Sequence, residues 1–163
     1  MRFLAAVVVI AVALAFQTAV LPAIHLLGVR PDLLLVLLMC WAFIRGPDEG
    51  RVVVVVTAML YGMLTADPAG FSLLALAPIV PLALLRESDV AGNRFVLALA
   101  LVAAATLAHE TIYSLLIAAT EGSANIPGTA LHVYAPAIIV NVLLGAVVYL
   151  VVLGFSRDVR ATR

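Results

Sequence analysis

The arginines of this chain are distributed unevenly between its hydrophobic blocks. The sequence of 163 residues contains nine arginines and no lysine. If every block crosses a membrane, only Arg30 falls on one side. On the opposite side fall Arg2, Arg45, Arg51, Arg86, Arg94, Arg157, Arg160 and Arg163. Arginine in short loops is retained on the cytoplasmic face of a membrane. The pattern therefore predicts a multi-pass protein of the bacterial inner (cytoplasmic) membrane, with both termini in the cytoplasm.

The composition agrees with a protein embedded in lipid. Apolar residues make up 66% of the chain and charged residues 11%, far from the balance of a soluble protein. Because the formal net charge is zero, we expect no nucleic-acid partner. The only cysteine is Cys40, so we expect no internal disulfide, no cysteine-based metal site and no other cofactor. The length predicts one integral membrane domain covering residues 1–163.

Six apolar segments divide the chain, and they predict an all-α bundle of six transmembrane helices. The segments cover approximately residues 3–24, 31–44, 52–66, 71–85, 95–120 and 132–155. A helix needs about 20 residues to cross a bilayer. The three middle segments are shorter than that, so flanking residues must extend them or the bilayer must thin locally.

A different arrangement of the middle segments satisfies the same arginine pattern. Residues 52–66 and 71–85 can form a re-entrant hairpin that turns at Asp67 and Pro68. Removing two spans together leaves every arginine on its original side, so the charges do not distinguish six spans from four. Removing the segment 31–44 alone would invert everything that follows it. That segment is therefore expected to span the membrane.

Three connections carry the residues of turns and loops. Residues 46–50 read Gly-Pro-Asp-Glu-Gly and predict a tight cytoplasmic turn, and residues 67–70 read Asp-Pro-Ala-Gly and predict a tight external turn. Residues 121–129 form the longest external connection. We expect it to be the loop with most room to contact another molecule.

Polar side chains within the fifth segment share one helical face. Thr106, His109, Glu110, Tyr113 and Ser114 follow the three-and-four spacing of a helix. Polar groups at this depth are costly and should face the protein interior. One interpretation is a proton relay or ligand site built on His109 and Glu110. The other is a buried carboxyl group, protonated or hydrogen-bonded, that joins the helices.

Two further polar stripes predict hydrogen bonds between helices in the bundle core. One, in the sixth segment, contains Asn141, Gly145 and Tyr149. The other, in the third segment, contains Thr57, Tyr61 and Thr65.

One serine invites comparison with six-span intramembrane proteases of the rhomboid type. Ser72 follows Gly70 and Phe71 at the start of the fourth segment, where those enzymes carry their nucleophile. A serine nucleophile needs a histidine base within hydrogen-bond reach. The sixth segment has Asn141 where a rhomboid has that histidine, and His109 lies on a different helix. We therefore expect no enzymatic activity and no catalytic residues.

Short motifs between the second and fourth segments resemble a known family. Residues 28–33 read Gly-Val-Arg-Pro-Asp-Leu and residues 45–50 read Arg-Gly-Pro-Asp-Glu-Gly; residues 61–67 read Tyr-Gly-Met-Leu-Thr-Ala-Asp, and Gly70 and Leu-Leu-Ala-Leu at 73–76 follow. These motifs are similar to those of the rod shape-determining protein MreD family. That family pairs Pro-Asp-Leu with a Gly-x-x-x-Gly loop and a Gly-Leu-x-x-Asp helix end. The chain departs from the pattern at Met63 and in the valine run 52–56.

The resemblance implies a non-enzymatic scaffold of the bacterial cell-elongation complex. Such proteins bind MreC, a single-span periplasmic partner. Through MreC they connect to MreB filaments and to the peptidoglycan polymerase and transpeptidase. The resemblance also implies the six-helix fold of the substrate-binding S-components of energy-coupling-factor transporters. The alternative function is therefore a vitamin-binding or metabolite-binding transporter component. A homo-oligomer is compatible with either function.

The residues expected to matter for a partner or for the fold come from the same motifs. At the external ends of the helices they are Arg30, Pro31, Asp32, Asp67 and Gly70. We expect Asp32 to cap the N-terminus of its helix, which stabilises a helix by roughly 1 kcal/mol. Close helix packing is expected at Gly62, and Gly46 and Gly50 belong to the family's cytoplasmic loop.

Overall fold

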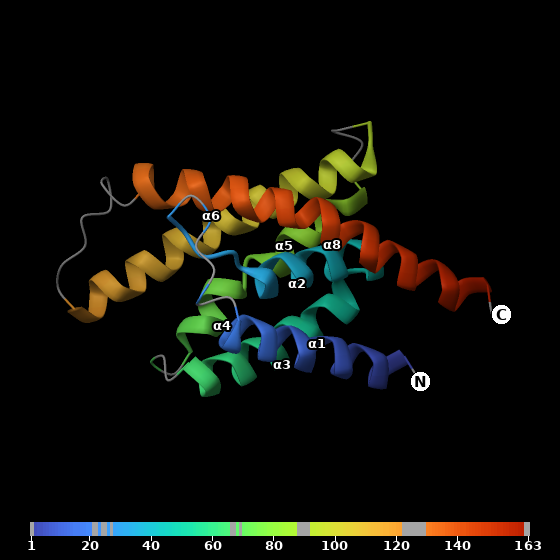
Figure 1. The fold of residues 1–163 in the computed structure, drawn as a ribbon, viewed down its shortest axis with the longest axis horizontal. Helices are drawn as coiled ribbons and strands as arrows, with labels where there is room; N and C mark the ends of the chain where they lie inside the picture. Colours follow the sequence, from blue (N-terminus) through green and yellow to red (C-terminus); the bar gives the residue numbers. More distant parts are fainter. Residues whose placement is uncertain are drawn as a thin grey trace.

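The computed structural model describes residues 2–20, 23, 26, 28–65, 68, 70–87, 92–121 and 130–161. The described chain is helical, and its only extended pairing is an isolated bridge between Leu26 and Val29. The elements are α1 (Arg2–Ala19), α2 (Leu33–Arg45), α3 (Pro47–Thr65), α4 (Phe71–Leu76), α5 (Ile79–Leu84), the 3-10 turn η2 (Leu85–Glu87), α6 (Arg94–Glu121), the π-helical turn η4 (Ala130–Tyr134) and α8 (Ala135–Ala161). Figure 1 shows α2 in the middle of the bundle, with α6 and α8 on one side and α1 and α3 on the other.

Helix α2 is the core of the molecule. Its sequence, from Leu33 to Ile44, is apolar on every face, and a helix of this kind must be buried on all sides. Leu35, Val36 and Met39 have no exposed surface. The helix packs against α8, α3, α6, α5 and α1. The other helices of the bundle therefore pack around α2, although its apolar segment is short.

The connection between α2 and α3 differs from the expected turn at residues 46–50. Only Gly46 separates the helices, because α3 already begins at Pro47. Proline is favoured in the first turn of a helix, where its missing N–H is not needed. Asp48 and Glu49 also lie in that first turn, where negative charge is favourable. The motif is thus a helix start with a one-residue link, and Gly46 has a left-handed φ of 109°.

The fourth apolar segment is two short helices and not the continuous helix expected over residues 71–85. Helix α4 ends at Leu76, and α5 begins at Ile79. Pro78 and Pro81 explain the break, because each removes a backbone donor from the helical ladder and its ring crowds the preceding turn. Helix α4 packs against α3 and α6, and α5 packs against α2, α3 and α6.

The remaining helices follow the predicted segments with shifted ends. Helix α1 ends at Ala19, short of the expected residue 24, and Pro22 follows it in the sequence. Helix α6 covers the predicted segment 95–120 and one residue on each side. The sixth segment opens with η4, so Pro136 falls in the first turn of α8. Residues 122–129 lie outside the described chain.

Within the part of the chain that the structure describes, two helices have the length and hydropathy to cross a membrane. They are the stretches Arg94–Thr120 in α6 and His132–Gly154 in η4 and α8. The apolar stretches Val8–Ala19 and Leu33–Arg45 are shorter.

The two ends of α2 differ in the arginines that lie near them. The guanidinium of Arg94 lies 5.9 Å from the ring centroid of Phe43, near the C-terminal end of α2. At the same end, a Cβ added to Gly46 would lie 2.9 Å from Nη1 of Arg86. Arg30 precedes the opposite end of the helix. Both chain termini lie at the same end of the molecule (Figure 1).

Candidate functional site

A polar cavity lies at the N-terminal end of α2. Its volume is about 280 Å³. The lining residues come from α1, from the segment that precedes α2, from α2 itself, and from α3, α4 and α6. They are Gln17, Arg30, Pro31, Asp32, Leu34, Tyr61, Ser72, Leu76, His109, Glu110 and Tyr113. The structure therefore joins two groups that the sequence separates by more than 70 positions: the motif at residues 30–32 and the polar face of α6.

Asp32 caps α2 as expected. Its Oδ1 accepts a hydrogen bond of 3.0 Å from the backbone N–H of Leu35. The neighbouring backbone donors are satisfied by other helices: Leu33 N–H donates to Oε1 of Gln17 at 3.0 Å, and Asp32 N–H donates to Oδ1 of Asn141 at 2.9 Å. The first turn of a helix leaves four such donors without intrahelical partners. The start of α2 is therefore held by its own cap and by side chains from α1 and α8.

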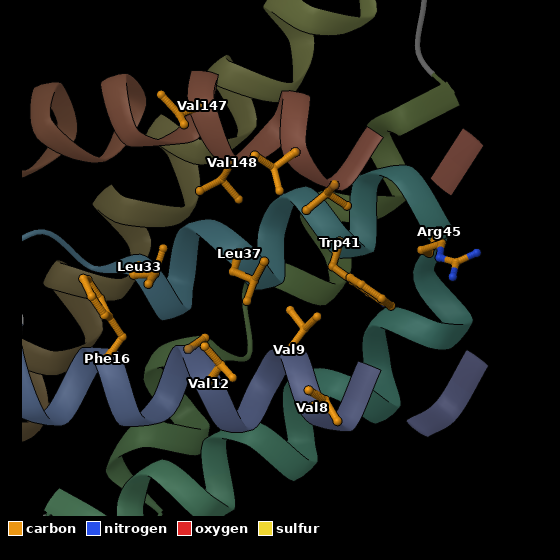
Figure 2. A pocket seen from close by; sticks show the side chains of 13 residues that line it. Val8, Val9, Val12, Phe16, Leu33, Leu37, Trp41, Arg45, Val147 and Val148 are labelled. Carbon is orange, nitrogen blue, oxygen red and sulfur yellow. The ribbon is translucent and has the colours of Figure 1, made fainter. Parts of the chain in front are cut away.

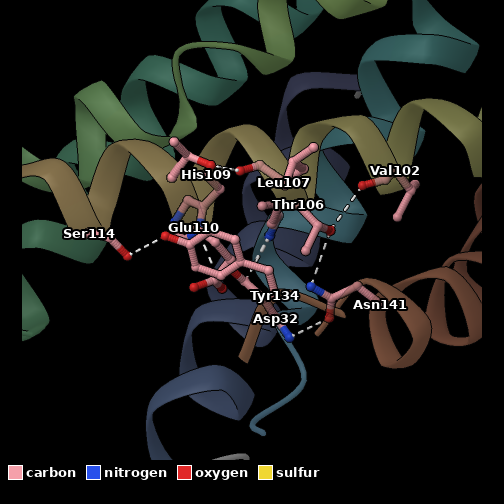
Figure 3. A network of polar contacts seen from close by, with 11 residues as sticks. Asp32, Val102, Thr106, Leu107, His109, Glu110, Ser114, Tyr134 and Asn141 are labelled. Atoms are coloured by element: carbon pink, nitrogen blue, oxygen red, sulfur yellow. Dashed lines mark hydrogen bonds and ion pairs between the residues drawn. The ribbon is translucent and has the colours of Figure 1, made fainter. Parts of the chain in front are cut away.

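Asn141 connects three parts of the bundle. It is 1% exposed, and besides accepting from Asp32 N–H it donates from Nδ2 to Oγ1 of Thr106 at 3.3 Å. Thr106 in turn donates to the carbonyl of Val102 at 2.9 Å. Figure 3 shows these contacts running from the start of α2 through α8 to α6. Asn141, one member of the polar stripe predicted on the sixth segment, thus makes hydrogen bonds between helices.

The polar face of α6 supplies the other wall of the cavity. His109 Nδ1 and Glu110 Oε1 are 3.9 Å apart, and the side chains are 17% and 25% exposed, respectively. The ring of Tyr113 stacks on that of His109, with centroids 6.1 Å apart. Ser114 accepts a 2.8 Å hydrogen bond from the hydroxyl of Tyr134 in η4 (Figure 3). Four of the five predicted polar positions of α6 therefore contribute to the cavity or to contacts beside it, and Thr106 contributes to the network with Asn141.

Ser72 and His109 line the same cavity but do not form a nucleophile–base pair. Ser72 is 4% exposed. Neither Ser72 Oγ nor His109 Nδ1 has a hydrogen-bond partner among the described residues. A serine protease needs a direct bond between these groups. Among the described residues, Ser72 Oγ has no hydrogen-bond partner, and the nearest charged neighbour of His109 Nδ1 is the Glu110 carboxylate at 3.9 Å.

The glycines of the motifs differ in whether the structure leaves space for a larger side chain. A Cβ at Gly50 would lie 2.7 Å from Cβ of Ala42, so α3 and α2 touch there. At Gly62 the nearest atom, Ser72 Oγ, would lie at an ordinary 3.5 Å. Helix α3 is therefore in contact with α4 at Gly62, and its approach to α2 at Gly50 is closer still. Gly70 has a left-handed φ of 91° before α4, and Asp67 lies outside the described residues.

The sequence predicts Tyr61 in a core stripe and offers Ser72 only as a candidate nucleophile, and it assigns no role to Gln17. All three line the cavity. Tyr61 and Gln17 lie on helices far from α6 in sequence, and no spacing rule connects them to it. Among the described residues, there is no group of three or more His, Cys, Asp or Glu side chains that could hold a metal ion.

An apolar groove lies between α1, α2 and α8 (Figure 2). Its volume is about 540 Å³. Helix α1 forms one wall with Val8, Val12 and Phe16, α8 forms the other with Val147 and Val151, and α2 forms the floor with Leu33, Leu37 and Trp41. Val12 is 63% exposed and Val147 61%. Arg45 lies at one end of the groove, 5.2 Å above the ring of Trp41.

Replacing Asp32 tests whether its role is capping. Asp32→Ala is expected to lower stability by about 1 kcal/mol, because the Leu35 N–H loses its acceptor. Asp32→Asn is expected to stay near wild type, since asparagine also caps helices. Thermal unfolding of the detergent-solubilised variants would measure the difference. Equal loss in both variants would show that the carboxylate charge matters and that capping alone does not explain the residue.

One known protein family matches nearly the whole chain. A family model described as rod shape-determining protein MreD matches residues 1–159. Searches of curated proteins and of solved structures returned no match.

Proposed function

Because the chain belongs to the rod shape-determining protein MreD family, we propose that it is a non-enzymatic membrane scaffold of the bacterial cell-elongation complex. The family implies a role in determining rod shape, and its members are bacterial membrane proteins. The family match over residues 1–159 is the observation that carries the proposal. The scaffold binds an MreC-type single-span protein and, through it, MreB filaments and the peptidoglycan polymerase and transpeptidase.

The proposed topology has six membrane-crossing segments in the inner membrane, with both termini in the cytoplasm. The distribution of arginines supports it, as does the position of both termini at one end of the molecule. Helix α3 has 19 residues, about 28 Å at 1.5 Å per residue, and its charged first turn would lie at the interface, so flanking residues complete this span. Helices α4 and α5 together form the broken fourth span. The S-component-like fold remains part of this proposal.

The apolar groove is the proposed docking site for the partner's transmembrane helix. Its walls carry exposed side chains spaced four residues apart, Val8, Val12 and Phe16 on α1 and Val147 and Val151 on α8. Such rows are the ridges between which another helix packs. Valine has few rotamers, so both walls are rigid before the partner arrives. Contacts of this kind drive helix association in membranes, where the hydrophobic effect is absent.

Filling the groove tests the proposal. Val147→Trp is expected to lower recovery of the MreC-type partner in a mild-detergent pull-down at least about tenfold, because the large ring occupies the space of the incoming helix. The matched control is Leu143→Trp, which changes a residue of the same helix that is 66% exposed and does not line the groove. Membrane levels of both variants should match wild type.

Each outcome has a clear meaning. Selective loss with Val147→Trp supports partner docking in the groove. Equal recovery from both variants would move the partner to another face. Retention of phospholipid in the groove of the intact complex would identify it as a lipid site. Recovery of ATPase subunits with a stoichiometric small molecule, in place of cell-wall synthases, would overturn the scaffold and favour a transporter component.

A further inference from the structure

Helix α1 is held to the bundle by a narrow apolar stripe. Among its side chains that the structure describes, only Ile10, Ala13 and Leu14 are buried. Val12 and Phe16, which form one wall of the apolar groove, are 63% and 44% exposed. In a bilayer such a stripe fixes the position of a helix only weakly, because lipid tails are as apolar as the surface that the helix covers. The position of this wall therefore depends on more than apolar contact.

The side chain of Gln17 joins α1 to α2. Its Oε1 accepts the backbone N–H of Leu33, in the first turn of α2, at 3.0 Å. The other polar side chain that the structure describes on α1, Thr18, bonds only to carbonyls of its own helix, those of Leu14 and Ala15. The Leu33 N–H is one of the donors that the start of a helix leaves without an intrahelical partner. A displacement of α1 would take away its acceptor.

This hydrogen bond lies at one end of the groove. Phe16, which precedes Gln17, belongs to the α1 wall, and Leu33 itself belongs to the floor. Figure 2 shows Phe16 and Leu33 at one end of the groove and Arg45 at the other. Gln17 lines the polar cavity and not the groove. A residue outside the groove therefore joins its wall to its floor.

The opposite wall has more polar contacts with the rest of the bundle. Helix α8 packs against both α2 and α6. Asn141 on α8 accepts the N–H of Asp32 at 2.9 Å and donates to Oγ1 of Thr106 on α6 at 3.3 Å. Helix α1 packs against α2 and α3, with Gln17 as its polar contact to α2. The width of the groove is therefore set chiefly by the position of α1.

We propose that Gln17 is a positioning residue for the docking groove: its hydrogen bond to the Leu33 N–H holds α1 at the distance from α8 that fits the partner's helix. This inference rests on the function proposed for the groove. Loss of the bond lets α1 occupy a wider range of positions, and the apparent affinity for the partner falls with the fraction of molecules that remain competent to bind. A hydrogen bond between helices in a membrane shifts such an equilibrium roughly threefold on average.

The first measurement follows α1 in the absence of the partner. Nitroxide labels on Ala15→Cys and Leu143→Cys report the distance between α1 and α8, because both residues are exposed and neither lines the groove. Cys40 is 1% exposed, so the introduced cysteines are labelled selectively. Electron paramagnetic resonance should give a narrow distance distribution with Gln17 present. Gln17→Met, which keeps the length of the side chain and removes its acceptor, should broaden or shift it.

A reference distance separates movement of α1 from loosening of the whole bundle. Labels on Met63→Cys of α3, a residue that is 81% exposed, and on Leu143→Cys of α8 do not involve α1. Their distance should stay the same in Gln17→Met, and a change in both distances would overturn a specific role for Gln17. The matched control is Thr18→Val, which removes only bonds within α1 and should leave both distances unchanged.

The second measurement adds the partner. Gln17→Met should lower recovery of the MreC-type partner roughly threefold relative to Thr18→Val, at equal membrane levels. An unchanged distance between α1 and α8 in Gln17→Met would overturn the inference. So would full recovery of the partner by Gln17→Met when Val147→Trp loses it. Full recovery by both variants would instead overturn docking in the groove, while a broadened distance would still support the hold of Gln17 on α1.

Discussion

Gly50→Leu is expected to destabilise the bundle by about 3 kcal/mol or more and to remove most of the folded protein from the membrane. A Cβ at this position would lie 2.7 Å from Cβ and 3.2 Å from Cα of Ala42. The second of these atoms is backbone, so α3 must move away from α2 to make room. Overpacking usually costs 1–3 kcal/mol where flexible side chains can adjust. Here α3 would have to move away from α2, whose core residues Val36 and Met39 have no exposed surface.

The same substitution elsewhere separates crowding from a general effect of replacing glycine. Gly154→Leu introduces leucine in α8 at a site where an added Cβ has no neighbour within 4 Å. Its stability should equal or exceed that of wild type, because leucine favours helix more than glycine does. Gly62→Ala should also be tolerated, since the nearest atom would be 3.5 Å away. Membrane levels and thermal unfolding in detergent would measure all three. A Gly50→Leu protein as stable as the Gly154→Leu protein would contradict the close helix contact.

Asn141→Leu is expected to lower stability by about 2–4 kcal/mol. Leucine has a similar volume but leaves the N–H of Asp32 without its acceptor and Thr106 Oγ1 without its donor. A buried donor without a partner costs about 1–3 kcal/mol, and the start of α2 loses its link to α8. Thr106→Val should cost less, because it removes only the 3.3 Å bond to Asn141 and the bond to Val102 within the helix.

The control for Asn141→Leu is Thr120→Val. Thr120 is exposed, and its hydroxyl bonds only to carbonyls of its own helix. Its removal should change stability by less than about 0.5 kcal/mol. Thermal unfolding should rank the variants Thr120→Val, Thr106→Val and Asn141→Leu in order of increasing loss. Asn141→Leu as stable as Thr120→Val would show that the hydrogen bonds between helices contribute little in lipid or detergent.

The candidate site was only partly predictable from the sequence. The polar face of α6 follows from the spacing of His109, Glu110 and Tyr113, because residues three and four apart share a helical face. The capping role of Asp32 follows from its position before an apolar run. Neither rule indicates that these two groups meet. Their meeting depends on how α2 and α6 cross.

The predicted boundaries are close where an apolar segment forms a single continuous helix. They are wrong where the same residue types are favoured both in turns and at the start of a helix. The segment that became α6 was placed within one residue at each end. Residues 46–50 predict a turn because Gly, Pro and Asp favour turns. The same residues also suit the first turn of a helix, and in the structure α3 begins at Pro47.

The sequence by itself determined that this chain enters a membrane, which family it belongs to and which helix faces are polar. These properties depend on local hydropathy, charge and motif spacing, which are independent of how the helices pack. Only the tertiary structure decided that Arg30, Asp32, Ser72, His109 and Glu110 surround one cavity and that α1 and α8 border an apolar groove. Contacts between helices depend on side-chain shape at many positions at once, so no single segment of sequence contains them.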